Sequence, residues 1–171
     1  MKKLLYFFTM MALFSACRQD SDDPPTGEVA FHLITNFETV GNSCEIDPST
    51  VEWMSIPFLS YMDLISYNPQ NHRFALTEQG VDIVKNRDYP VDGVGFVLLA
   101  NGALVYTGYF YPAYSSQSCD WVVIEPLNVA YNGYLEVRLG YPGEVLDGSI
   151  PDLRNDSAIL NIFARDGKLV E

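Results

Sequence analysis

One stretch constrains the fold more than any other: residues 96–110, FVLLANGALVYTGYF. Asn101-Gly102 lies between two apolar, β-forming runs, and this dipeptide favours a type I′ hairpin turn because both central residues need a positive φ. Both faces of the predicted hairpin are apolar, so we expect it in the middle of the domain, covered on both sides. A two-residue turn also sets the register, which pairs Ala100 with Ala103, Leu99 with Leu104, Leu98 with Val105 and Val97 with Tyr106.

Several other segments have strand patterns. Residues 29–37 alternate with a period of two, and residues 134–139 alternate cleanly after an Asn-Gly turn. β-rich runs also occupy residues 58–67, 72–77 and 121–125. With the hairpin this makes about seven or eight short strands, which predicts a single antiparallel β-sandwich with one or two short helices; a small β-barrel is the alternative.

Two places have helix signals. Asp47-Pro48 is typical of an N-cap followed by Pro at the first helical position, with room for only a turn or two of helix before Pro57. Asn155-Asp156 predicts a cap for a helix over residues 157–165, although Asp166-Gly167 equally permits a last hairpin, and we favour the helix. We expect loops over residues 78–95, 115–120 and 140–151.

The chain opens with Met1-Lys2-Lys3 and then runs from Leu4 to Ala16 without a charge. This run is shorter than the about 20 residues that a membrane-spanning helix needs, and it predicts a secretory signal peptide over residues 1–16. Its end, Phe14-Ser15-Ala16-Cys17, resembles the lipobox of bacterial lipoproteins, with Phe14 where Leu is usual. The resemblance implies cleavage before Cys17, lipidation of the Cys17 thiol and acylation of the new amino terminus.

Residues 17–27 contain acids and prolines and almost no apolar side chains, which predicts a flexible tether ahead of one β-rich domain over residues 28–171. The acidic cluster after Cys17 is similar to the surface-export signal of Bacteroidetes lipoproteins. We therefore expect an exported outer-membrane lipoprotein, held to the membrane by its lipid anchor and displayed on the cell surface, with the periplasmic leaflet as the alternative.

Three cysteines occur in the chain. If Cys17 carries lipid, Cys44 and Cys119 remain, and an even remainder in an exported chain predicts one disulfide. The chain-entropy model gives such a bridge, which closes a long loop, about 4 kcal/mol of stabilisation.

The formal net charge of −12 argues against nucleic acid as a partner, because the electrostatic contribution opposes binding.

No motif for nucleophilic catalysis, cofactor binding or a His-based metal site is present: His32 and His72 lie far apart, and we predict neither a cofactor nor a metal. Asp147, Asp152, Asn155 and Asp156 crowd one stretch, which we interpret as a solvated acidic loop, with oxygen ligands for calcium as the alternative. A carboxylate-dependent hydrolase and a structural subunit of an envelope or pilus-like assembly remain alternatives.

Aromatic residues gather between Tyr106 and Trp121. Tyrosine and tryptophan rings have flat apolar faces and a polar edge, which suits sugar rings and protein partners alike. Successive strand side chains face opposite ways, so the run Tyr109 to Tyr114 cannot lie wholly in one core. The hypothesis is a non-enzymatic module that binds glycan or protein through Tyr109, Tyr111, Tyr114 and Trp121; a β-core with tyrosine hydroxyls at its rim is the competing interpretation.

Overall fold

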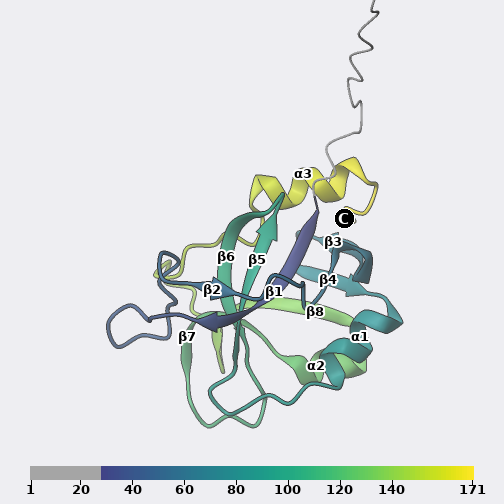
Figure 1. Cartoon of the computed structure of the whole chain (residues 1–171). Coiled ribbons are helices and arrows are strands. Elements are labelled where there is room, and N and C mark those ends of the chain that lie inside the picture. The colour runs from purple at the N-terminus through teal and green to yellow at the C-terminus, as the bar shows by residue number, and fades with distance from the viewer. Residues whose placement is uncertain (1–27) are drawn as a thin grey trace, which may run out of the picture.

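The computed structural model describes residues 28–171, shown in Figure 1. Its eight strands are β1 (Val29–Asn36), β2 (Glu52–Trp53), β3 (Leu64–Asn68), β4 (Arg73–Leu76), β5 (Val94–Ala100), β6 (Ala103–Phe110), β7 (Cys119–Ile124) and β8 (Tyr134–Tyr141). The helices are α1 (Glu78–Lys85), α2 (Pro126–Asn132) and α3 (Ser157–Arg165), with a 3-10 turn η1 (Tyr61–Asp63) before β3. The signal peptide, the lipid site and the tether predicted for residues 1–27 lie outside the described residues. No helix among residues 28–171 is long and apolar enough to cross a membrane.

The strands form one mixed sheet in the order β2-β1-β5-β6-β7-β8-β4-β3. Every pair in it is antiparallel except β6 with β7. The sheet bends over its own core and does not close, which gives a sandwich-like all-β fold and confirms the predicted class over the small barrel (Figure 1).

The central hairpin forms where the sequence predicts it. Asn101 and Gly102 both have positive φ, 55° and 76°, and β5 and β6 lie between β1 and β7. The predicted pairs Ala100–Ala103 and Leu99–Leu104 are confirmed. The next two predicted pairs, Leu98–Val105 and Val97–Tyr106, are wrong.

A bulge causes that difference in register. Leu98 pairs with Tyr106 and Val97 pairs with Thr107, so Val105 is an extra residue on β6. A β-bulge adds one residue to one strand and increases the local twist, and the length of the turn gives no information about it.

Phenylalanines fill the centre of the core. The ring of Phe31, on β1, lies 5.4 Å from both Phe74 and Phe96 in edge-on contacts, and Phe96 lies 5.1 Å from Phe110. All four are fully buried. Edge-on and tilted ring contacts add to the free energy gained from burial, by about 0.5–1.5 kcal/mol for each pair.

Two helices occur where loops or strand ends were expected. Thr77 caps α1 by accepting a hydrogen bond from Gly80 N at 3.1 Å, and Glu78 and Lys85 match the helix dipole. In α2, Pro126 stands in the first turn and Gly133, with φ 73°, ends the helix. Pro at the start and Gly just after the end is a known helix pattern, hidden here by the shortness of the segment.

The expected helical turn at 47–52 is wrong, whereas α3 matches its prediction. Asp47 Oδ1 accepts from Ser49 N at 2.9 Å and from Ser49 Oγ at 2.7 Å, which forms a local turn instead of a helix start. Asp156 caps α3 by accepting from Ala158 N at 2.7 Å. The helix therefore forms over residues 157–165 and the alternative hairpin does not.

The predicted Cys44–Cys119 disulfide is confirmed, with the two Cα atoms 5.6 Å apart. Asp120 Oδ1 also accepts a hydrogen bond from Cys44 N at 2.8 Å. Together they fasten the long loop between β1 and β2 to the start of β7.

The chain enters the domain beside the hairpin turn. Asn101 N donates to Glu28 O at 3.0 Å, and Figure 1 shows the start of β1 near α3, whereas α1 and α2 lie at the other end of the sheet. β6 runs from the turn to that other end, so the segment that follows Phe110 lies far from Glu28.

Candidate functional site

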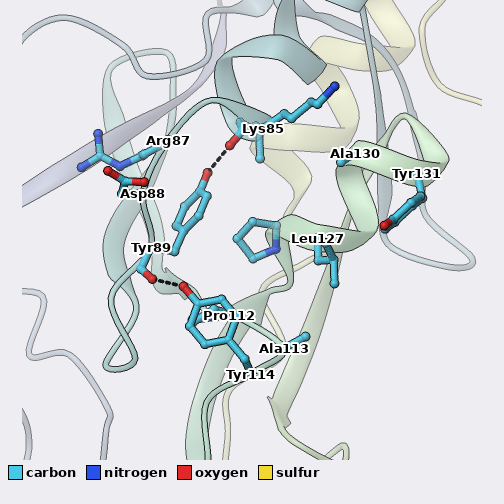
Figure 2. A pocket seen from close by; sticks show the side chains of 12 residues that line it. Lys85, Arg87, Asp88, Tyr89, Pro112, Ala113, Tyr114, Leu127, Ala130 and Tyr131 are labelled. Atoms are coloured by element: carbon cyan, nitrogen blue, oxygen red, sulfur yellow. Dashed lines mark hydrogen bonds between the residues drawn. The ribbon is translucent and has the colours of Figure 1, made fainter.

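A groove of about 440 Å³ lies between α1, α2 and the loop after β6. Most of its lining is apolar or aromatic, as Figure 2 shows. Three separate segments supply the lining: residues 84–89 at the end of α1, residues 112–114 after β6, and Pro126, Leu127, Ala130 and Tyr131 on α2.

Tyr89 forms one wall of the groove. Its hydroxyl donates to Val84 O at 2.8 Å, at the end of α1, and its ring lies 6.0 Å from the core ring of Phe110. Burial of the hydroxyl raises the pKa of Tyr89 well above its ordinary value, so the side chain stays a neutral hydrogen-bond donor. The Tyr89 side chain is therefore fixed both by the bond of its hydroxyl to α1 and by the contact of its ring with the core.

Tyr114 closes the lower end of the groove in Figure 2. Its hydroxyl donates to Tyr89 O, yet 69% of the side chain is exposed. Tyr141 Oη donates to Ala113 O at 2.9 Å and so fixes the loop that carries Tyr114. The Tyr114 ring is thus both exposed and fixed at its two ends.

Helix α2 supplies the third wall. Leu127 and Tyr131 are four residues apart and therefore lie on one face of the helix, and they are 50% and 80% exposed. On the inner side of the helix, Val129 is fully buried and anchors it to the domain. Val129 thus fixes α2 to the core, while Leu127 and Tyr131 expose apolar surface at the rim of the groove.

The charged groups of the lining are Lys85, Arg87 and Asp88. In Figure 2 the Lys85 side chain extends along the upper rim on the α2 side, whereas Arg87 and Asp88 lie beside each other on the outer side of Tyr89. Asp88 is the one acid of the lining. Hydrolysis by paired carboxylates needs two acids flanking the scissile bond, and this groove supplies one.

The structure separates the four aromatic residues that the sequence grouped. Tyr109, Tyr111 and Trp121 are buried, with exposed fractions of 6%, 4% and 9%. Trp121 Nε1 donates to Thr107 Oγ1 at 3.0 Å inside the core, and the Tyr111 ring lies 4.9 Å from Tyr141. Of the four, Tyr114 alone lines the groove.

Tyr89, Leu127 and Tyr131 complete the groove but were not among the predicted ligand-binding residues. A signal for two of them existed in the sequence. Pro126 and Gly133 delimit a short helix, and within it Leu127 and Tyr131 fall on one face. No comparable local pattern points to Tyr89.

His32 and the acids of the 147–156 loop have local structural partners. His32 Nδ1 lies 2.7 Å from Met54 O. Burial and the nearby Arg154 guanidinium lower the pKa of His72. Of the acids, Asp152 holds Arg154 through contacts of 2.9 and 2.8 Å, Asp147 accepts from Ser149 N at 2.9 Å, and Asp156 caps α3. Within residues 28–171 no group of three or more His, Cys, Asp or Glu side chains is placed to hold a metal ion.

Comparison of the chain with protein-family models, curated proteins and solved structures finds no match.

Proposed function

We propose that this chain is a binding module of the bacterial cell envelope, held by a lipid anchor on Cys17, and that its ligand occupies the groove between Tyr89, Tyr114 and Tyr131. The single observation that carries the proposal is the gathering of exposed Tyr114, Leu127 and Tyr131 side chains around one groove.

Scattered exposed apolar residues are normal on a soluble domain, whereas clustered ones around a concave site are typical of binding surfaces. The volume of about 440 Å³ lies within the usual range for ligand pockets. The Tyr114 ring is also fixed before any ligand arrives, by its bond to Tyr89 O. A preformed site loses less conformational entropy on binding.

The envelope location rests on the lipobox-like Phe14-Ser15-Ala16-Cys17 and on the acidic segment that follows it. Several acyl chains anchor a protein durably, since each buried CH₂ group contributes about 0.8 kcal/mol. Glycans and proteins of the cell surface are the partners that such a module meets.

The test is binding by the detergent-solubilised full chain to a glycan array and to envelope proteins in a pull-down. We expect Tyr131→Ala to weaken the observed binding at least about fivefold, as loss of an aromatic anchor does. Met62→Ala is the control, because Met62 is equally exposed and lies outside the groove. Binding that Tyr131→Ala leaves unchanged, or no binding in either assay, would overturn the proposal.

A further inference from the structure

Two basic side chains differ from the other five in residues 28–171. Arg73, Arg138, Arg154 and Arg165 each pair with a carboxylate, and Lys168 Nζ donates to two backbone carbonyl oxygens. Within residues 28–171 the side chains of Lys85 and Arg87 form neither a hydrogen bond nor an ion pair, and both belong to the segment at the end of α1 that forms one side of the groove.

Of these two, Lys85 is the one placed at the rim. Its side chain extends on the side of α2, whereas Arg87 points away from the groove (Figure 2). The Arg87 guanidinium lies over the Phe58 ring, 5.7 Å from its centroid. A ligand in the groove therefore meets one cation whose charge is not neutralised by a partner.

The charge of the whole chain limits the kinds of anion that can bind favourably at Lys85. The net charge is −12, so a dense polyanion is repelled by the rest of the domain. A ligand with a single carboxylate gains the contact with Lys85 and suffers little of that repulsion, because salt screens exposed charges beyond about 8 Å.

The backbone of the groove is better suited to a saccharide than to an extended peptide. Pro112 and Pro126 have no N–H to offer, and α2 uses its own amides, as in the bond from Gly133 N to Val129 O at 2.9 Å. A peptide would leave backbone groups poorly paired there. A sugar ring rests its apolar face on a tyrosine and keeps its hydroxyls in water.

We infer that the groove binds an acidic saccharide, with sugar rings on Tyr114 and Tyr131 and one carboxylate at Lys85. This inference rests on the proposed function and adds to it the class of ligand. The contact between carboxylate and ammonium distinguishes an acidic sugar from a neutral one of the same shape.

The test uses a matched pair of probes: a xylotriose carrying one glucuronic acid, and the same oligosaccharide after its carboxyl group has been reduced to the alcohol. Titration calorimetry with the detergent-solubilised full chain should show about fivefold tighter binding of the acidic form, the upper range for an exposed ion pair. Lys85→Gln should remove this preference and leave binding of the reduced form unchanged.

Arg87→Gln is the matched control and should keep the preference, because its side chain points away from the groove. Equal binding of the two probes by the wild-type chain, or an equal loss of both in Lys85→Gln, would overturn the inference and leave the proposed function standing. If the chain binds an acidic peptide and neither saccharide, and Tyr131→Ala abolishes that binding, the inference is also overturned and the proposed function stands. If the saccharides do not bind and Tyr131→Ala changes no interaction of the chain, both proposals fail.

Discussion

At the scale of single residues, Gly108 marks the tightest place in the core. A Cβ built on it lies 2.7 Å from Phe96 Cζ and 2.7 Å from the backbone oxygen of Val122. Neither neighbour has room to move, because Phe96 is fully buried among other rings and Val122 belongs to β7. This glycine lets β6 and the Phe96 ring approach closely.

We therefore predict that Gly108→Ala lowers the free energy of unfolding by about 1–3 kcal/mol, the usual range for overpacking. Urea unfolding followed by tryptophan fluorescence measures the effect. Gly143→Ala is the control, since a Cβ there meets nothing within 4 Å, and it should leave the stability unchanged or slightly raised. Equal effects of the two substitutions would contradict the prediction.

Asp166 gives a second prediction at this scale. Arg165 donates to both of its oxygens at 2.7 Å, and the Tyr61 hydroxyl donates at 2.8 Å. These bonds hold the pKa of Asp166 at about 2, below the ordinary 3.8. A lowered carboxylate pKa stabilises the fold above pH 4, and the stabilisation is lost as the pH falls toward 2.

The difference in unfolding free energy between the wild type and Asp166→Asn should accordingly be largest above pH 5 and shrink toward pH 2. Denaturant titrations at a series of pH values give this difference. A constant difference across that range would show that Asp166 does not stabilise the fold through its charge.

At the scale of elements, the disulfide determines how firmly the loop between β1 and β2 is held. The bridge joins residues 75 positions apart, so its loss frees a long segment in the unfolded chain. We expect Cys44→Ser with Cys119→Ser to lower the free energy of unfolding by about 2–4 kcal/mol. Thermal unfolding and intact mass with and without a reductant check this, and an unchanged stability would refute it.

Elements with strong local signals were predictable from the sequence. The Asn101-Gly102 turn and its first two pairs depend on neighbouring residues alone, as do the strands β1 and β8 and the helix α3 with its Asp156 cap. The bulge at Val105 and the helices α1 and α2 were not predicted. A bulge reflects packing from both sides, and short helices give little periodicity.

The groove was less predictable than the fold. Its walls come from residues 84–89, 112–114 and 126–131, and these meet because of the order of strands in the sheet. Tyr109, Tyr111 and Trp121 look the same in sequence as Tyr114, yet the central position of β6 and β7 buries Tyr109 and Trp121, and Tyr111 is buried against Tyr141. The sequence shows where the aromatic residues gather. Only the order of the strands in the sheet determines which of them are buried in the core and which line the groove.

At the scale of the whole molecule, the lipid anchor remains a prediction that lies outside the described residues. Cys17→Ser should move the chain from the detergent phase to the aqueous phase in a cloud-point partition, because it removes the thiol that carries the lipid. The double variant at Cys44 and Cys119 is the control and should stay in the detergent phase. Partitioning that Cys17→Ser leaves unchanged would refute the anchor.

The position of Glu28 beside the Asn101-Gly102 turn bears on how a tethered molecule stands on its membrane. β6 leads away from that turn for eight residues, and its seven steps of about 3.3 Å span about 23 Å, before the chain reaches Tyr114. The chain therefore enters the domain at its α3 end, and the Tyr114 end of the domain lies opposite the point to which a tether is joined. The groove and the attachment point of a tether are thus at opposite ends of the domain, so a ligand can reach the groove without contacting the segment by which the chain enters the fold.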